Sequence, residues 1–163
     1  SRLEKSSAPI AFSEIDLDEA IHNAIRHVDL LVKSKKGSIS TGFESSEKLF
    51  KGNLNHITNL IINLLDNSIK YSDNPPKIRI TKSNTSKHLV FTIEDSGIGM
   101  DLTTQKFVFE KFYREQSGNI HNIKGHGLGL SYVKKIVDLH NGSIDLFSNV
   151  GKGTTFTISF PKK

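Results

Sequence analysis

Cysteine is absent from this chain of 163 residues, and long hydrophobic runs are absent as well. The missing thiols exclude disulfide bonds, thiolate zinc sites and cysteine nucleophiles. The longest apolar stretches, at 60–62 and 64–65, fall far short of the ~20 residues that span a bilayer, and the polar first residues do not resemble a signal peptide. We therefore expect a soluble domain whose chemistry comes from other side chains.

Proline is also scarce, with 4 residues against 12 glycines, and the composition is 36% hydrophobic and 24% charged. These values are ordinary for a globular protein, and the length predicts a single domain with its own core. The formal net charge is +5. A basic balance favours a polyanion, which leaves nucleic acid, a membrane surface and a nucleoside triphosphate as alternatives.

Hydrophobic periodicity predicts the helices. After Asp16, a good N-cap, apolar residues recur every three to four positions, which predicts a helix that ends at 35–37. A second periodic segment begins at Asn53 and ends near Ser72. A third helix is expected from about Gly127 to Leu139, and a short helical stretch is expected at 103–112.

Runs of β-branched and aromatic residues between turn signals predict strands. The two glycine-containing turns near the end of the chain predict an antiparallel pair after the third helix. Helices and strands therefore mix, with antiparallel character. The expected strands are 38–43, 48–51, 77–81, 89–94, 143–147 and 154–160.

Three glycine clusters lie between these elements, and each has a purely structural interpretation as a strand end, a helix start or a hairpin turn. They are Gly97/Gly99, Gly127/Gly129 and Gly151/Gly153. No Gly-x4-Gly-Lys-Ser/Thr loop occurs, the spacing at 125–129 does not fit Gly-x-Gly-x-x-Gly, and the eukaryotic-type kinase motifs are missing. These familiar phosphate-binding folds are therefore disfavoured.

The second helix carries Asn63, Asn67, Lys70 and Tyr71 on one face, because their spacing is three to four residues. Carboxamide oxygens suit Mg²⁺ that phosphate already partly neutralises, and a lysine suits phosphate. The alternative interpretation is a solvated polar face, as on any surface helix.

Five motifs taken together resemble the catalytic ATP-binding domain of sensor histidine kinases, in the order found in that family. They cover about residues 50–156, and the five together are far more specific than one glycine motif. In this sequence they read Asn63-Leu64-Leu65-Asp66-Asn67-Ser68-Ile69-Lys70-Tyr71, Asp95-Ser96-Gly97-Ile98-Gly99-Met100, Phe109-Glu110-Lys111-Phe112-Tyr113-Arg114, Gly125-His126-Gly127-Leu128-Gly129-Leu130 and Gly151-Lys152-Gly153-Thr154.

The resemblance implies a fold and a domain plan. The fold is the α/β (α+β) two-layer sandwich of the gyrase and chaperone ATPases, also called the Bergerat fold. It has a mixed, largely antiparallel sheet on about three helices, and a flexible lid expected at 113–126. The plan assigns 1–12 to a linker that follows a missing dimerisation domain, and 13–163 to the catalytic domain.

The same resemblance assigns site roles. Asn67 would coordinate Mg²⁺ with Asn63 nearby, Lys70 would meet phosphate, Tyr71 would pack beside the base, and Asp95 would accept a hydrogen bond from the adenine amino group. A carboxylate only accepts hydrogen bonds, so Asp95 should also prefer adenine over guanine. The other expected contacts with ATP come from the glycine-rich segments, the lid and the last turn: Gly97, Gly99, Phe112, Arg114, Gly125, His126, Gly127, Leu128, Gly129, Leu130 and Thr154.

The resemblance further implies partners. Autophosphorylation in this family needs a histidine that is commonly followed by Glu or Asp, and none of the seven histidines here is. The acceptor is therefore expected on a separate helical domain of a homodimeric parent, with transfer onward to the receiver domain of a response regulator. The domain is expected to lie in the cytoplasm, without a nucleic-acid partner and without direct contact with a membrane. Whether its parent protein is anchored in a membrane is left open. The alternative function is a non-catalytic switch that uses ATP to bind protein.

Overall fold

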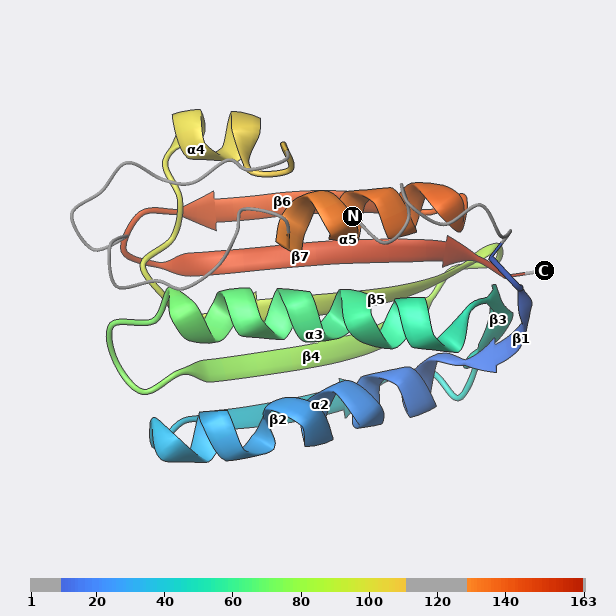
Figure 1. Ribbon diagram of the computed structural model, residues 1–163, viewed down its shortest axis with the longest axis horizontal. Helices are drawn as coiled ribbons and strands as arrows, with labels where there is room; N and C mark the ends of the chain where they lie inside the picture. The colour runs from blue at the N-terminus through green and yellow to red at the C-terminus, as the bar shows by residue number, and fades with distance from the viewer. Residues whose placement is uncertain (1–9, 111–128, 163) are drawn as a thin grey trace.

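The computed structural model describes residues 10–110 and 129–162, and these residues form two layers. A five-stranded sheet of order β2-β4-β5-β7-β6 is covered on one face by α2, α3 and α5 (Figure 1). The elements are β1 (Ser13–Asp16), α2 (Leu17–Ser34), β2 (Ser38–Phe43), β3 (Leu49–Gly52), α3 (Leu54–Lys70), β4 (Lys77–Asn84), β5 (His88–Asp95), α4 (Leu102–Phe107), α5 (Gly129–Leu139), β6 (Ser143–Asn149) and β7 (Gly153–Pro161).

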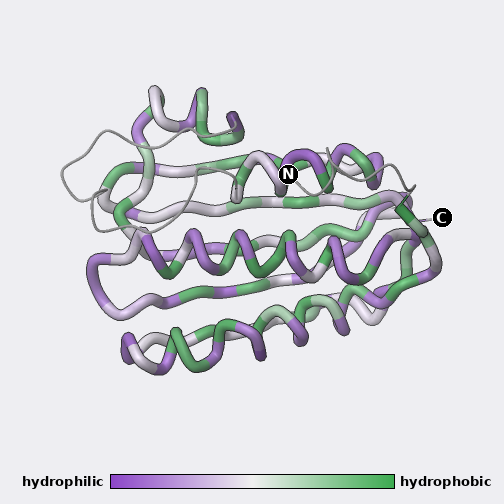
Figure 2. Tube along the Cα trace, viewed as in Figure 1, coloured by the Kyte–Doolittle hydropathy of each residue, from purple (hydrophilic) through white to green (hydrophobic). Residues whose placement is uncertain are grey.

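The two long helices begin where the sequence predicts. Asp16 caps α2 by accepting hydrogen bonds from the backbone N–H groups of Asp18 (2.8 Å) and Glu19 (3.2 Å). Asn53 caps α3 by accepting from the backbone N–H of His56 (3.0 Å). Side-chain oxygens at these positions satisfy donors that the first helical turn leaves unpaired. Along both helices apolar and polar residues alternate with the helical period, and the apolar side faces the sheet (Figure 2).

The sheet is mixed, which confirms the expected architecture. Strands β4, β5, β7 and β6 pair antiparallel, while β2 pairs parallel with β4 in the register Ser38↔Lys77 to Phe43↔Lys82. A parallel pair needs a long crossover, and here the chain between the two strands includes β3 and α3. Alternate residues of β4, β5 and β7 are buried against the helices, so the other face of the sheet is open.

Strand β1 was not expected from the sequence. It pairs antiparallel with β3, in the register Ser13↔Gly52 to Asp16↔Leu49, and forms a separate two-stranded sheet. Four residues are too few to show a period of two, and the capping signal of Asp16 dominates the local pattern. The strand forms because it pairs with β3, more than thirty residues away, and residues near β1 in the sequence do not reveal this pairing.

The core lies between the two layers and includes the fully buried rings of Phe50, Phe91, Phe156 and Phe160. Lys82 is also fully buried, and its ammonium pairs with the carboxylate of Asp18 in the first turn of α2. The short helix expected at 103–112 is α4, which ends at Phe107, and Phe109 packs edge-on against the ring of Phe156 (6.2 Å between centroids). The expected lid lies outside the described residues.

Candidate functional site

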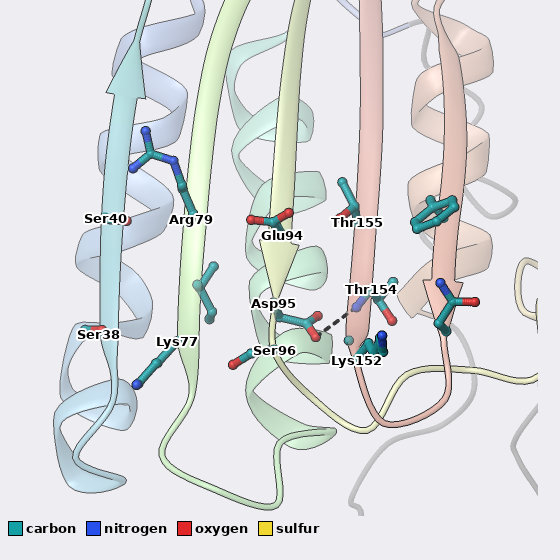
Figure 3. Close-up of a pocket in the computed structure, with 14 residues that line it drawn as sticks. Ser38, Ser40, Lys77, Arg79, Glu94, Asp95, Ser96, Lys152, Thr154 and Thr155 are labelled. Atoms are coloured by element: carbon teal, nitrogen blue, oxygen red, sulfur yellow. Dashed lines mark hydrogen bonds between the residues drawn. The ribbon is translucent and has the colours of Figure 1, made fainter.

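Asp95, the last residue of β5, lies at one end of the sheet with 8% of its surface exposed. Its Oδ1 accepts two backbone hydrogen bonds, one from Gly97 at 2.9 Å and one from Thr154 at 3.2 Å, of which Figure 3 shows the second. The first donor belongs to the loop after β5 and the second to the start of β7. The side chain is therefore oriented by main-chain groups from both adjoining segments.

Burial raises the pKa of the Asp95 carboxyl, because a charge in a poorly hydrated site is costly. Hydrogen bonds from the backbone of Gly97, the side chain of Ser68 and the backbone of Thr154 act in the opposite direction and favour the carboxylate. The net direction is upward. Both backbone donors bond to Oδ1, so Oδ2 accepts no backbone hydrogen bond from a described residue.

Glycine is required in the loop after β5 by close approach of the main chain. A Cβ on Gly97 would lie 2.6 Å from the carbonyl oxygen of Tyr71, and the N–H of Ile98 donates to that same oxygen (2.9 Å). Tyr71 is the C-cap of α3. The loop is therefore fastened to the C-terminal end of α3, and Asp95 is held beside that end.

Two further glycines combine a positive φ with contact between backbones. Gly99 has φ +74° and a Cβ there would lie 2.0 Å from the carbonyl oxygen of Asn149, while Gly153 has φ +99° and a Cβ there would lie 2.0 Å from that of Asp95. Any other residue would be strained in these conformations and would also clash. The glycines thus allow the β5 loop and the β6–β7 turn to pack against each other.

Ser148 of β6 joins the loop and the turn, and sequence reasoning missed this residue. Its hydroxyl accepts from the backbone N–H of Met100 (2.8 Å), donates to the carbonyl of Gly153 (2.9 Å) and lies 2.8 Å from the hydroxyl of Thr154. Strand periodicity places Ser148 on a face of the sheet, but only the pairing of β6 with β7 brings it to these partners.

The polar face of α3 leads to the same end of the fold. The Asn63 amide donates to the carbonyl of Asn59 (2.8 Å), which orients its Oδ1 toward α5, 3.2 Å from the position of a Cβ on Gly129. Asn67 is half-buried one turn further on, and Lys70 is exposed. Among the residues described, the Asn67 side chain has no protein hydrogen bond, so its carboxamide is available to a ligand.

The structure thus brings several of the expected site residues to one end of the sandwich, at the left in Figure 1, where α3 ends, β5 ends and β7 begins. Asn67, Lys70, Tyr71, Asp95, Gly97, Gly99 and Thr154 belong to this end, and Asn63 faces Gly129. Leu130 has its side chain in the hydrophobic core. The remaining expected contacts lie outside the described residues, namely Phe112, Arg114, Gly125, His126, Gly127 and Leu128.

Comparison with protein families agrees with this arrangement. The family model described as "Histidine kinase-, DNA gyrase B-, and HSP90-like ATPase" matches residues 52–163. Sensor protein RprX of Bacteroides fragilis is 37% identical over 163 residues, which are 99% of this chain and 31% of RprX. The sensor-like histidine kinase SenX3 of Mycolicibacterium smegmatis is 31% identical over 162 residues, which are 99% of this chain and 42% of SenX3. The chain thus spans less than half the length of both relatives.

Solved structures share the fold. The nucleotide-free catalytic domain of histidine kinase ThkA is similar with a TM-score of 0.81 at 23% identity, covering 93% of this chain and 98% of that domain. ThkA in complex with the response regulator protein TrrA gives a TM-score of 0.77 at 22% identity, covering 93% of this chain and 42% of ThkA.

The fold and the site define a nucleotide-binding α/β sandwich. The chain belongs to the histidine kinase-, DNA gyrase B- and HSP90-like ATPase family, as a catalytic ATP-binding domain of the kind found in sensor histidine kinases. The predicted family and fold class are confirmed. Within 10–110 and 129–162 no helix is long and apolar enough to cross a membrane, and no group of three or more His, Cys, Asp and Glu side chains forms a metal cage.

Proposed function

We propose that this domain binds Mg·ATP at the end of the sandwich formed by α3, β5 and β7, and presents the γ-phosphate to a histidine on another domain. The observation that carries the proposal is the buried Asp95 carboxyl, whose Oδ1 is fixed by two backbone donors while Oδ2 accepts no backbone hydrogen bond from a described residue. Adenine carries an amino group that donates to such an oxygen, whereas guanine presents a carbonyl there.

Tyr71 and the glycine loop form the surroundings of the base in this proposal. Tyr71 lies at the end of α3, and its carbonyl is bonded to the loop that follows Asp95. Gly97 and Gly99 let the loop after β5 pack closely on Tyr71 and on the β6–β7 turn, which fixes the position of Asp95. The base would bind beside this loop, with its amino group directed at the Asp95 carboxylate.

The residues of α3 fit a magnesium ion shared with phosphate. Asn63 directs its amide oxygen toward Gly129 because its nitrogen donates to the Asn59 carbonyl, and the Asn67 carboxamide, one turn along, has no hydrogen bond to a described residue. Neutral amide oxygens and few protein ligands suit Mg²⁺, which keeps water and phosphate in its coordination shell. When bound, the ion neutralises charge on the phosphates. Asn67 would be the ligand with Asn63 beside it, and the exposed Lys70 would contact phosphate.

The phosphate end of ATP would lie at the start of α5. Gly129 opens this helix, and free backbone N–H groups at a helix start favour anions. Arg114 and the segment 125–128 complete the proposed phosphate site, with Phe112 at the base of a lid over 113–126. We assign these residues by family resemblance alone.

The phosphoryl acceptor would be a histidine on the dimerisation domain of the same parent protein. The chain supplies positioning and charge stabilisation, which dominate phosphoryl transfer, but no acceptor. In this plan residues 1–12 are the linker from that domain and residues 13–163 are the catalytic domain. The domain lies in the cytoplasm, its parent is a homodimer, and the receiver domain of a response regulator takes the phosphoryl group. Support for the last partner comes from ThkA, whose structure was solved with the response regulator TrrA.

The test is reconstitution. The domain is mixed with the helical histidine domain of its own parent and with ATP labelled at the γ-phosphate, and label is sought that is lost in acid and retained in base. We expect label only when both domains and Mg²⁺ are present. Nucleotide binding without any transfer would instead support a non-catalytic ATP-dependent switch, and absence of nucleotide binding would refute both functions.

A further inference from the structure

A hollow of about 580 Å³ extends over the face of the sheet turned away from the helices, and only Asp95 and Thr154 of its lining also belong to the proposed nucleotide site (Figure 3). A volume of this size is typical of small-molecule sites. Its floor is formed by the ends of the strands, and Asp95 and Thr154 mark the boundary with the nucleotide site. Charged and hydroxyl side chains dominate the rest of its lining, chiefly Ser38, Ser40, Lys77, Arg79, Glu94 and Lys152.

Arg79 does not pair with the acidic residue opposite to it. Arg79 of β4 and Glu94 of β5 are partners in the antiparallel register, yet no ion pair joins them. The guanidinium instead extends over β2, where its Nη2 lies 2.6 Å from the position of a Cβ on Gly42 (Figure 3). Glycine at position 42 therefore leaves the space that the guanidinium occupies.

Two hydroxyls lie next to two cations on this face. In the parallel register Ser38 is the partner of Lys77 and Ser40 is the partner of Arg79, so all four side chains are on the same side of the sheet. Among the residues described, neither Lys77 nor Arg79 makes an ion pair. A guanidinium without an ion partner among the described residues, next to a hydroxyl donor, suits an oxyanion, since it binds phosphate or carboxylate through parallel hydrogen bonds.

We propose that this hollow binds a small soluble oxyanion, a phosphate or a carboxylate, held by Arg79 and Ser40, while Lys77, whose side chain points away from Arg79 (Figure 3), adds positive potential. Lys152 lies at the far side of the hollow and adds positive potential. Glu94 lies between Arg79 and Lys152 (Figure 3), so a broad anionic surface such as nucleic acid or a membrane would have to cover this carboxylate, whereas a small anion at Arg79 need not contact it. The site is separate from the proposed nucleotide site and does not depend on it.

The first experiment is an NMR titration of the isotope-labelled domain at constant ionic strength, with inorganic phosphate in one arm and succinate in the other. We expect saturable shifts of the backbone amides of β2 and β4 around Ser40 and Arg79 in at least one arm. The arm with the tighter binding identifies the oxyanion. A lack of saturable shifts up to about 50 mM of both anions would overturn the proposal, since even weak sites saturate in this range.

Three variants test the residues. Arg79→Gln removes the guanidinium, and Gly42→Ala displaces it without a change of charge. Lys87→Gln removes one positive charge at an exposed position of the β4–β5 turn as a matched control. We expect the Kd to rise about tenfold or more in the first two variants and to stay within about twofold in the control. Equal Kd values for Arg79→Gln and Lys87→Gln, with Gly42→Ala unchanged from the unaltered protein, would show nonspecific charge attraction and would overturn the site. Thermal melts check that each variant is folded.

The titration is repeated with saturating ATP, so that phosphate cannot occupy the nucleotide site. We expect the same shifts around Ser40 and Arg79. Loss of these shifts under ATP would place the anion at the nucleotide site and contradict the proposal. If the protein fails to bind ATP, the proposed function fails, while the titration without nucleotide still tests the hollow.

Discussion

The ring of His140 joins the end of α5 to the start of α3: its Nε2 accepts a hydrogen bond from the backbone N–H of Asn53 (3.1 Å). The other ring nitrogen, Nδ1, lies 2.8 Å from the carbonyl oxygen of Ile136 and donates to it, so the neutral tautomer satisfies both contacts. The ring is buried and stacks on Phe12 at 4.6 Å between centroids. The two helices that flank the proposed nucleotide site are thus fastened together at their far ends.

This contact predicts a loss of stability in mild acid. Burial lowers the pKa of His140, and His56 nearby adds to the effect, so the unfolded chain takes up a proton at a higher pH than the folded chain. The free energy of unfolding should therefore fall as the pH drops below the ordinary histidine pKa of about 6.5, by about 1.4 kcal/mol for each unit between the two pKa values. Urea unfolding at pH 7.5 and pH 5 measures this difference. His140→Leu should remove most of this difference in stability between the two pH values, and His27→Gln, an exposed control, should retain it. An equal pH dependence of stability in the unaltered protein and both variants would contradict the assignment to His140.

Asp95→Asn should weaken ATP binding by about ten- to a hundredfold. The amide would present an NH₂ group where the adenine amino group needs an acceptor, and a lost hydrogen bond to a charged group costs about 1.5–3 kcal/mol. Calorimetric titration with ATP measures the loss. Asp145→Asn, an exposed carboxylate of β6, is the matched control and should bind ATP normally. Unchanged affinity in Asp95→Asn would remove the account of base recognition.

Asn67→Ala should weaken ATP binding more with Mg²⁺ than with EDTA, because the proposed role of its amide is to hold the ion. Nucleotide affinity is measured under both conditions for the variant and for Asn59→Ala, an exposed asparagine on the same helix. If the ATP affinity of Asn67→Ala falls by the same factor with Mg²⁺ and with EDTA, Asn67 does not bind the metal. The control variant is expected to match the unaltered protein.

Gly153→Ala should destabilise the protein far more than Gly151→Ala. Both glycines have positive φ, which costs alanine about 1–2 kcal/mol. Only at Gly153 would the new Cβ also meet backbone, 2.0 Å from the carbonyl oxygen of Asp95, whereas nothing lies within 4 Å at Gly151. Chemical denaturation should therefore show a loss of about 3 kcal/mol or more for Gly153→Ala. Equal losses would mean that the contact with Asp95 is easily relieved.

The buried pair of Lys82 and Asp18 predicts a non-additive mutant cycle. Asp18→Asn leaves a fully buried ammonium without its counter-charge and should cost about 3 kcal/mol. Asp18→Asn combined with Lys82→Met should recover most of that loss, because neither charge is then buried. The exposed pair of Lys33 and Asp29 is the control, and Asp29→Asn should change stability by less than about 0.5 kcal/mol. Additive effects of the two core substitutions would contradict the prediction.

Local patterns were enough to predict the helices and most strands, since caps such as Asp16 and Asn53 and the apolar period act over a few residues. They were also enough to single out the two parts of the proposed site that lie on α3 and after β5. They did not predict β1, the parallel pairing of β2 with β4, or the contacts of Ser148. Each of these depends on which distant segments meet, and that is set by tertiary packing.

His140 and Arg79 show the same limit at single residues. In the sequence His140 is one of seven histidines, and its role depends on a contact with Asn53, 87 residues away. Arg79 follows a simple alternating pattern, and only the structure reveals that Gly42 on another strand receives its guanidinium. When the partner of a side chain lies far away in the sequence, the neighbouring residues do not reveal the contact.

Strand β7 is last in chain order yet lies between β5 and β6 in the sheet, and it carries the Thr154 amide that orients Asp95. During synthesis the ribosome must release nearly all of the residues described before this inner strand can insert. Until then β5 keeps an unpaired edge and Asp95, the residue proposed to bind the base, lacks one of its two backbone donors. A nascent chain of this domain is therefore expected to gain nucleotide affinity in a single late step.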